Sequence, residues 1–216
     1  MKPRLAICLH GFLRTGVSML PMAWWLKHHG YHEVKCPTFK LGVDTLASHG
    51  DRLANLITAL SSQYNDAPVD IVTHSMGALV FRSSLQHDPA IRRAVLLAPP
   101  NQGAQAAQKV RDLVPLHRTG WDPLAELLPG VPIELPTASN LDVGILAGGR
   151  GSYRGFNPFL EGDNDGKVRV GEAPLLGMTD FRIVQAPHSI VMMMPTTFRL
   201  VLHFMNTGSF IGGQDC

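Results

Sequence analysis

The chain has 216 residues, of which 45% are hydrophobic, and a formal net charge of +2. This length and composition predict one domain, spanning residues 1–216, with a large apolar core. The small net charge and the lack of a Lys/Arg-rich run argue against nucleic acid or an anionic membrane surface as a partner. Three widely spaced cysteines, Cys8, Cys36 and Cys216, indicate neither a disulfide framework nor a metal site.

Near the N-terminus, Leu5–Leu9 is an apolar run typical of a buried parallel strand. It is too short for the apolar core of a signal peptide, and no later segment reaches transmembrane length, so we expect a cytoplasmic protein without a membrane span. The strand is followed by His10-Gly11-Phe12-Leu13. A glycine here lets the backbone turn tightly, so that the N–H of Phe12 or Leu13 can point at a reacting oxygen.

The next part of the chain alternates helical and strand patterns. Apolar spacing predicts a helix over residues 18–27, a short strand over 33–39 that Pro37 ends, and a helix over 46–60. Asp44 or Thr45 is the expected N-cap of the second helix. A histidine cluster at the end of the first helix is more typical of favourable placement at a helix C-terminus than of a metal site, since no acidic or thiol partner lies at ligand spacing.

A strand, a sharp turn and a helix are expected around Ser75. Val69–Val72 is a β-branched apolar run, and a helical pattern starts at Ala78. Such a turn presents the serine hydroxyl above the sheet, with the N–H of Met76 at the helix N-terminus beside it, which is the geometry of a nucleophile elbow. Thr73 replaces the first glycine of the usual G-x-S-x-G pattern, whereas Gly77 keeps the second. The alternative is a serine in an ordinary strand-to-helix turn.

Beyond the elbow, residues 94–98 form the next predicted strand. The regular alternation of strands and helices up to this point predicts an α/β fold, a mostly parallel sheet with helices on both faces. Asn101-Gln102-Gly103 then leads into a predicted helix rich in Ala and Gln, and residues 111–140 keep many apolar side chains without a clear period. We expect residues 101–140 to form a small cap or lid insertion over an apolar pocket, with a locally packed surface excursion as the alternative. Its apolar residues include Trp121, Leu124, Leu127, Leu128, Val131 and Ile133.

Two further strands, over residues 143–147 and 181–184, precede the remaining candidate site residues. Asp163 and Asp165 lie in the loop after the first of them, and His188 lies after the second, before a closing helix near 196–205. A serine nucleophile needs an imidazole to take its proton and a carboxylate to orient that imidazole. Ser75, one of the two aspartates and His188 follow the ends of parallel strands, so we expect them to meet at one edge of the sheet.

The residues at this predicted edge resemble the α/β-hydrolase superfamily, in its small esterase/lipase branch. The matching stretches, which extend over nearly the whole chain, are Leu9-His10-Gly11-Phe12, Thr73-His74-Ser75-Met76-Gly77, Asn101-Gln102-Gly103, Asn164-Asp165-Gly166-Lys167-Val168 and Pro187-His188-Ser189. The resemblance favours Asp165 over Asp163, because Asp165 directly precedes a glycine. Thr73 and Ala78 depart from the family's glycines.

This resemblance implies a hydrolase that transfers an acyl group to water through an acyl-serine, without a cofactor or metal. We expect small-molecule carboxylic esters as substrates, and the apolar cap suggests that they carry an apolar acyl or aromatic group. Ser75, His188 and Asp165 would be its catalytic residues, and the N–H groups of Phe12 and Met76 its oxyanion hole. The competing hypothesis is a catalytically silent protein of the same fold that binds an apolar ligand or a protein partner.

A calcium loop is a second interpretation of the acidic segment. Glu161, Asp163, Asp165, Gly166, Val168 and Glu172 match positions 1, 3, 5, 6, 8 and 12 of an EF-hand loop. Glutamate fits the first position poorly, and the preceding residues 151–158 are rich in glycine and proline rather than helical. We therefore expect no calcium site here.

Overall fold

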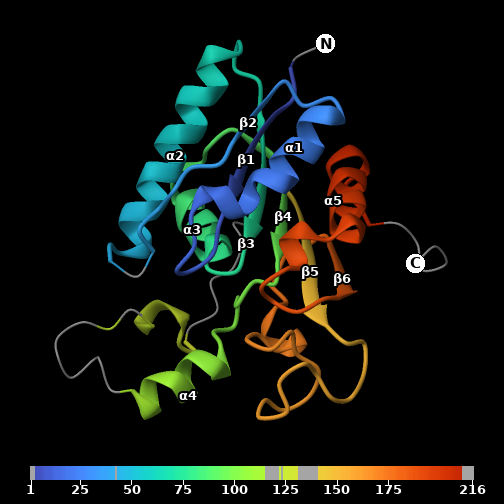
Figure 1. Cartoon of the computed structure of the whole chain (residues 1–216). Coiled ribbons are helices and arrows are strands. Elements are labelled where there is room, and N and C mark those ends of the chain that lie inside the picture. Colours follow the sequence, from blue (N-terminus) through green and yellow to red (C-terminus); the bar gives the residue numbers. More distant parts are fainter. Residues whose placement is uncertain (1–2, 42, 115–121, 123, 131–140, 211–216) are drawn as a thin grey trace.

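The computed structural model describes residues 3–41, 43–114, 122, 124–130 and 141–210 (Figure 1). Six parallel strands form one sheet in the order β2-β1-β3-β4-β5-β6. They are β1 (Leu5–Leu9), β2 (Glu33–Lys35), β3 (Val69–His74), β4 (Ile91–Leu97), β5 (Asp142–Gly149) and β6 (Asp180–Gln185). The predicted α/β fold is confirmed, and every pairing within this sheet is parallel.

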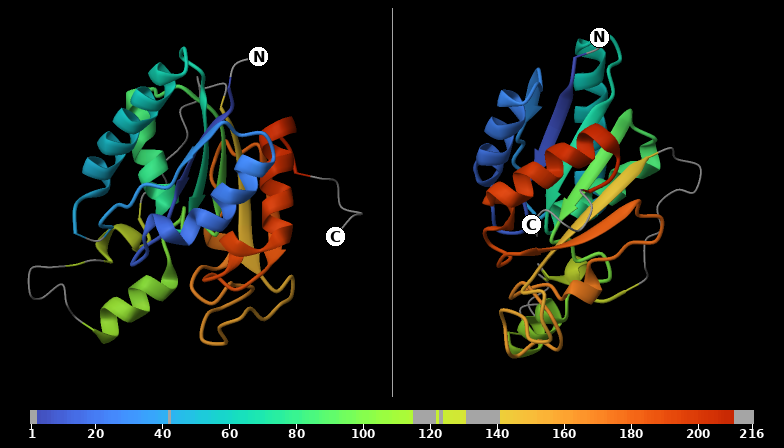
Figure 2. Two further views of the ribbon diagram at one scale, coloured as in Figure 1. Left: turned by 45° about the horizontal axis from the view of Figure 1, so that its top comes forward. Right: turned by 90° about the vertical axis from the view of Figure 1, so that its right-hand side faces the viewer.

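Helices cover both faces of the sheet (Figure 2). These helices are α1 (Leu20–His28), α2 (Leu46–Gln63), α3 (Gly77–Ser84) and α5 (Pro195–Thr207), while α4 (Gln105–Leu113) lies beyond the C-terminal edge of the sheet. Apolar residues of α2 and α3 pack on one face, and those of α1 and α5 pack on the other. The chain therefore has a three-layer architecture, as parallel sheets require when both of their faces are apolar.

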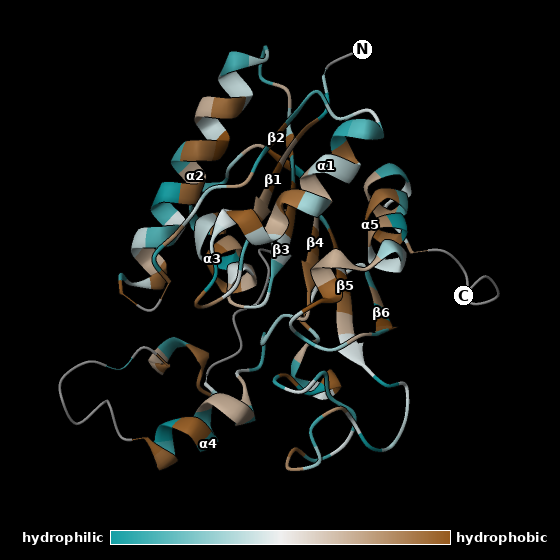
Figure 3. Ribbon diagram, viewed as in Figure 1, coloured by the Kyte–Doolittle hydropathy of each residue, from teal (hydrophilic) through white to brown (hydrophobic). Residues whose placement is uncertain are grey.

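Strand periodicity divides the apolar residues between the two cores. On β1, Leu5, Ile7 and Leu9 face the layer of α2 and α3, whereas Ala6 and Cys8 face the layer of α1 and α5. Figure 3 shows the apolar strands at the centre of the molecule. Because each fully buried large aliphatic side chain stabilises the fold by about 2 kcal/mol, these two layers fix the sheet that carries the site.

Local signals explain two of the element boundaries. Thr45 is the N-cap of α2, and its hydroxyl accepts the N–H of Ser48 across 3.2 Å. The strand predicted over 33–39 is shorter than expected, since β2 ends at Lys35. Pro37 lacks the N–H that a longer ladder would need. A short 3-10 helix, η1 (Gly16–Met19), precedes α1 and was not predicted.

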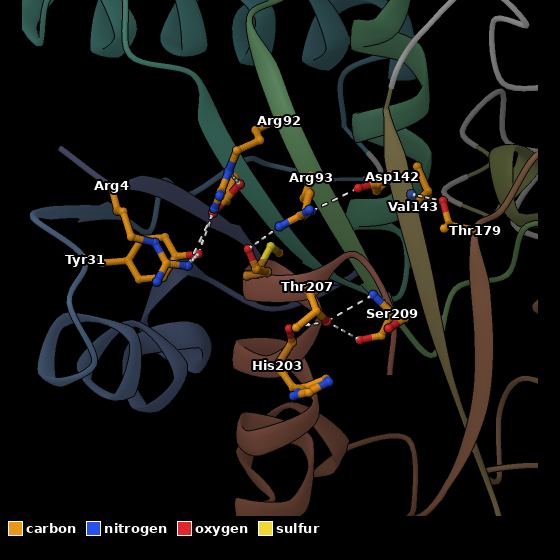
Figure 4. Close-up of polar contacts among 12 residues, drawn as sticks. Arg4, Tyr31, Arg92, Arg93, Asp142, Val143, Thr179, His203, Thr207 and Ser209 are labelled. Atoms are coloured by element: carbon orange, nitrogen blue, oxygen red, sulfur yellow. Dashed lines mark hydrogen bonds and ion pairs between the residues drawn. The ribbon is translucent and has the colours of Figure 1, made fainter. Parts of the chain in front are cut away.

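An ionic network lies at the N-terminal end of the sheet, and Figure 4 shows its residues Arg4, Tyr31 and Arg92. Asp70 of β3 is buried, and it accepts hydrogen bonds from the Tyr31 hydroxyl and from two nitrogens of Arg92. Arg4 donates to the Tyr31 oxygen and stacks on its ring. Burial, followed by the charge of Asp70, raises the pKa of Tyr31, which keeps this hydroxyl a donor. The network joins the beginnings of β1, β3 and β4.

The opposite, C-terminal edge of the sheet carries two excursions, which Figure 1 shows below the strands. One contains α4 and the 3-10 helix η4 (Ala125–Leu127), and the other is the loop after β5, which includes η5 (Val170–Glu172). Of the residues in the predicted cap, Trp121, Val131 and Ile133 lie outside the described residues. Among the helices in the described ranges, none combines the length and apolarity needed to cross a bilayer.

Candidate active site

Ser75 lies in a strained turn between β3 and α3. Its φ of 52° falls in the left-handed region, which costs a non-glycine residue of order 1–2 kcal/mol. The turn is held by the Ser75 N–H, which donates to Leu97 O, and by the Ala78 N–H, which donates to Ser75 O. This strand–turn–helix arrangement is the one predicted from the sequence.

Close packing around the turn explains its small residues. A Cβ on Gly77 would lie 2.7 Å from the carbonyl oxygen of His10, and one on Gly11 would lie 2.9 Å from the Cβ of Ser75. Glycine at both positions lets the loop after β1 approach the serine. Thr73, at the other flanking position, is fully buried, and its hydroxyl has no hydrogen-bond partner in the described part of the chain. The sheet thus accommodates a threonine where the usual pattern has glycine.

His188 and Asp165 meet Ser75 from two other loops. The Nε2 atom of His188 lies 3.0 Å from Ser75 Oγ, and its Nδ1 atom lies 2.7 Å from Asp165 Oδ2. Because a carboxylate only accepts, Nδ1 carries the proton and Nε2 is left to accept the serine proton. All three residues are less than one-tenth exposed. The three side chains therefore form one hydrogen-bonded chain.

Backbone amides hold Asp165 in place. Its Oδ1 accepts the N–H groups of Lys167 and Val168, and its carbonyl oxygen accepts the N–H of His188 across 2.8 Å. Asp163, the other aspartate considered, instead accepts the N–H groups of Arg150 and Gly151. Asp163 therefore stabilises the start of the same loop, and Asp165 alone of the two contacts His188.

Phe12 and Met76 supply backbone N–H groups near the serine. In the described part of the chain neither N–H donates to another protein atom. His10 supports the loop that carries Phe12: its Nδ1–H donates to Gly11 O, and its Nε2 accepts the N–H of Phe39. Burial lowers the pKa of His10, so that it stays neutral and keeps both bonds. His10 therefore has a structural role in this loop.

His74, directly before the serine, links the elbow to the loop of His188. Its Nε2–H donates to the backbone oxygen of His188 across 3.0 Å. Its Nδ1 is buried without a partner among the described residues, and a Cβ on Gly11 would lie 3.0 Å from it. Burial, followed by the positive field of a protonated His188, lowers the pKa of His74 well below its ordinary value. The ring is therefore held neutral.

A cleft of about 400 Å³ opens beside Ser75 and His188. One wall is apolar and comes from α4, η4 and the loop before them. Its residues include Pro100, Ala104, Ala107, Val110, Leu124 and Leu127. The loop after β1 adds Phe12 and Arg14, and the loop after β5 adds Asn157 and Lys167. The sequence interpretation had not identified Arg14 or Lys167, because a single cation in a loop carries no pattern.

The acidic segment does not converge on a metal site. Asp163 and Asp165 are engaged as described above, and the Glu172 carboxylate accepts the N–H groups of Arg169 and Gln105. Across the described ranges, no three His, Cys, Asp or Glu side chains are grouped so that they could hold a metal ion. At the end of α1, the rings of His28 and His29 bond to the backbone oxygens of Trp24 and Trp25.

Comparisons by sequence found no family model and no curated protein that match this chain. Its fold is similar to that of several solved structures. A Bacillus licheniformis lipase, BlEst2, in its mature form has a TM-score of 0.73 at 21% identity, covering 97% of this chain and 93% of that one. The Legionella pneumophila phospholipase PlaB has a TM-score of 0.69 at 14% identity, and the alignment covers 95% of this chain and 59% of the PlaB chain.

An extracellular α/β-hydrolase from a Paenibacillus species also aligns over its whole length. It covers 99% of this chain and 100% of that one, with a TM-score of 0.57 and 14% identity. Taken with the parallel sheet, the helices on both faces and the strand–turn–helix at Ser75, these likenesses establish that the chain has the fold of the α/β-hydrolase superfamily.

Proposed function

We propose that this protein is a serine hydrolase that cleaves carboxylic esters through an acyl-serine intermediate. The observation that carries the proposal is the hydrogen-bonded chain from Ser75 Oγ through the His188 ring to Asp165 Oδ2. A serine hydroxyl is a weak nucleophile at neutral pH, and this arrangement supplies the base and the orienting carboxylate that it needs. The positive φ of Ser75 adds support, because backbone strain gathers at functional sites.

In acylation, the Ser75 oxygen bonds to the ester carbonyl carbon while Nε2 of His188 takes the hydroxyl proton. The carbonyl oxygen becomes an oxyanion, which the N–H groups of Phe12 and Met76 would stabilise as hydrogen-bond donors. When the C–O bond of the ester breaks, the proton passes from His188 to the departing alcohol oxygen. Asp165 stays ionised throughout and stabilises the imidazolium.

In deacylation, water takes the place of the alcohol. Nε2 of His188 removes a proton from the water as its oxygen bonds to the acyl carbon, and the same proton then returns to Ser75 Oγ as the acyl bond breaks. The products are a carboxylic acid and free enzyme. These steps involve only the residues named and water.

The apolar wall of the cleft suits the acyl group. We infer that residues 101–140, as far as the structure describes them, belong to a cap on a single domain of residues 1–216, since α4 and η4 supply most of this wall. Moving an alkyl chain from water onto such a wall is favourable by about 0.8 kcal/mol for each methylene that is fully buried. Esters with an apolar acyl group are therefore the expected substrates.

A fluorophosphonate probe tests the nucleophile directly. It should modify Ser75 alone, and mass mapping of the labelled peptide should place the adduct on that residue, because only an activated serine attacks phosphorus readily. Ser75→Ala should remove labelling while Ser84→Ala, which changes a hydroxyl within α3, retains it. A folded protein that resists labelling would favour the alternative, a silent protein that binds an apolar ligand or partner.

A further inference from the structure

Two cations face the candidate cleft, and no carboxylate among the described cleft residues balances them. Arg14 and Lys167 both line it, and no Asp or Glu side chain is among the described residues that do. Neither forms an ion pair within the described ranges. The nearest acid of the site, Asp165, is 2% exposed and bonded to His188. The cleft surface therefore carries net positive charge.

Both cations lie in loops that form hydrogen bonds to the loop or to the carboxylate partner of His188. One Nη atom of Arg14 donates to the backbone oxygen of Ser189 across 3.0 Å, which fixes the guanidinium next to the histidine. Lys167 follows Asp165 by two residues, and its backbone N–H donates to Asp165 Oδ1, while its side chain is exposed. Burial is the main reason that the pKa of His74 is low, and the charges of Arg14 and Lys167 add to that effect.

The rest of the cleft has the opposite character. The wall formed by α4 and η4 presents alanine, valine and leucine side chains. In Figure 1, α4 and the loop after β5 both lie beyond the C-terminal edge of the sheet, α4 to the left and the loop to the right. A ligand that complements both parts has an apolar chain for one wall and an anionic group for the cations.

We propose that the substrates are anionic esters, in which an apolar acyl chain packs on α4 and the alcohol portion carries a phosphate or carboxylate bound by Arg14 and Lys167. The inference rests on the proposed function. The alcohol portion is assigned to the cations because its oxygen receives the proton from Nε2 of His188 and so lies on the His188 side of the cleft. Guanidinium and ammonium groups are the donors that phosphate and carboxylate prefer.

The test compares three soluble octanoyl esters below their micellar concentrations: octanoylglycerol, octanoylglycerol 3-phosphate and octanoyloxyacetate. In the wild-type chain at low salt, kcat/KM for at least one anionic ester should exceed that for octanoylglycerol by about fivefold or more. The preference should shrink as NaCl rises towards about 0.5 M, since exposed charges are screened. Whichever anionic ester is preferred distinguishes a phosphate from a carboxylate head group.

Variants assign the preference to the two side chains. Arg14→Gln and Lys167→Gln should each lower the ratio of anionic to neutral kcat/KM by about three- to tenfold, and Lys167→Glu should lower it further. Lys35→Gln is the matched control: it makes the same change of net charge on the edge strand β2, where Lys35 pairs with Glu33. That control should keep the wild-type ratio.

The outcomes separate this inference from the proposed function. Hydrolysis of octanoylglycerol with no preference for either anionic ester, or a preference that both glutamine variants retain, would overturn the inference alone. Hydrolysis of none of the esters would contradict the proposed function. In that case calorimetry with octyl phosphate and octanol still tests the cations. The inference is supported if the wild type binds octyl phosphate more tightly than octanol and Lys167→Gln weakens the binding of octyl phosphate. It is refuted if the wild type binds the two ligands equally, or if Lys167→Gln binds octyl phosphate as tightly as the wild type does.

Discussion

The ring of His74 donates a hydrogen bond to the backbone oxygen of His188, across 3.0 Å. The residue before the candidate nucleophile thus fixes the backbone of the candidate base. Since the carbonyl lies in a buried region, its partner matters for stability as well as for the position of the imidazole. This contact, which no sequence pattern specifies, ties β3 to the loop after β6.

Replacing His74 should therefore affect both folding and turnover. His74→Leu leaves the His188 carbonyl without its partner, so the free energy of unfolding should fall by about 1–3 kcal/mol and kcat should fall with it. His74→Gln keeps an N–H donor and should recover part of each loss. Urea unfolding and ester kinetics measure the two effects. Equal kcat in the wild type and the leucine variant would show that the contact does not position His188.

The same histidine should make the protein less stable in acid. Burial, and then a protonated His188, lower the pKa of His74 well below its ordinary value of 6.5. The unfolded chain therefore binds a proton below about pH 6.5 that the folded chain does not, and the free energy of unfolding decreases as pH falls through that point. The contribution is up to about 1.4 kcal/mol per pH unit. Urea unfolding at several pH values between 7 and 5 measures this effect. The free energy of unfolding of His74→Gln should fall less with decreasing pH than that of the wild type. An equal pH dependence in the two proteins would mean that His74 titrates alike in the folded and unfolded states.

Gly11 should be essential for the shape of the site although it has no side chain. An alanine Cβ there would lie 2.9 Å from the Cβ of Ser75 and 3.0 Å from His74 Nδ1, so the loop that carries Phe12 must move away. A displacement of about 1 Å at reacting groups can cost about 100-fold in rate, which is the loss of kcat expected for Gly11→Ala. Gly171→Ala, where a Cβ meets no atom within 4 Å, is the matched control and should keep its activity. Full activity in Gly11→Ala would exclude a role for this close approach.

The two aspartates of the loop after β5 should behave differently. Asp165→Asn removes the acceptor that holds the proton on Nδ1 of His188, and a change of this kind lowers kcat by about 10⁴-fold in serine hydrolases with a triad. Asp163→Asn alters only the contacts with Arg150 and Gly151 and should keep most of the activity. Steady-state kinetics of both variants decide the assignment. A larger loss of kcat in Asp163→Asn than in Asp165→Asn would assign the role of orienting His188 to Asp163 instead.

Much of the fold follows from local pattern. The strand Leu5–Leu9 has the predicted limits, and the order of strands and helices that predicted a parallel sheet is the observed one. Predicted limits fail where single residues override the pattern, as Pro37 does after β2. The cytoplasmic location and the cap over residues 101–140 stay predictions.

Part of the candidate site could also be predicted from the order of the strands. Ser75, Asp165 and His188 each follow a strand, and strand ends of a parallel sheet gather at one edge, so chain order alone brings them close. Arg14 and Lys167 have no such signal, since their shared position depends on how two loops, 153 residues apart in sequence, fold over the sheet. The hydrogen bond from His74 likewise depends on the direction of one ring in the packed core.

The most direct test of the proposed nucleophile is the turnover of a p-nitrophenyl ester by Ser75→Ala. The variant removes the hydroxyl that lies 3.0 Å from His188 Nε2. It should fold as the wild type does, by circular dichroism and thermal unfolding, while kcat falls by at least about 10⁴-fold. Ser84→Ala should keep wild-type turnover. A correctly folded Ser75→Ala protein that hydrolyses the ester as fast as the wild type would contradict the central claim.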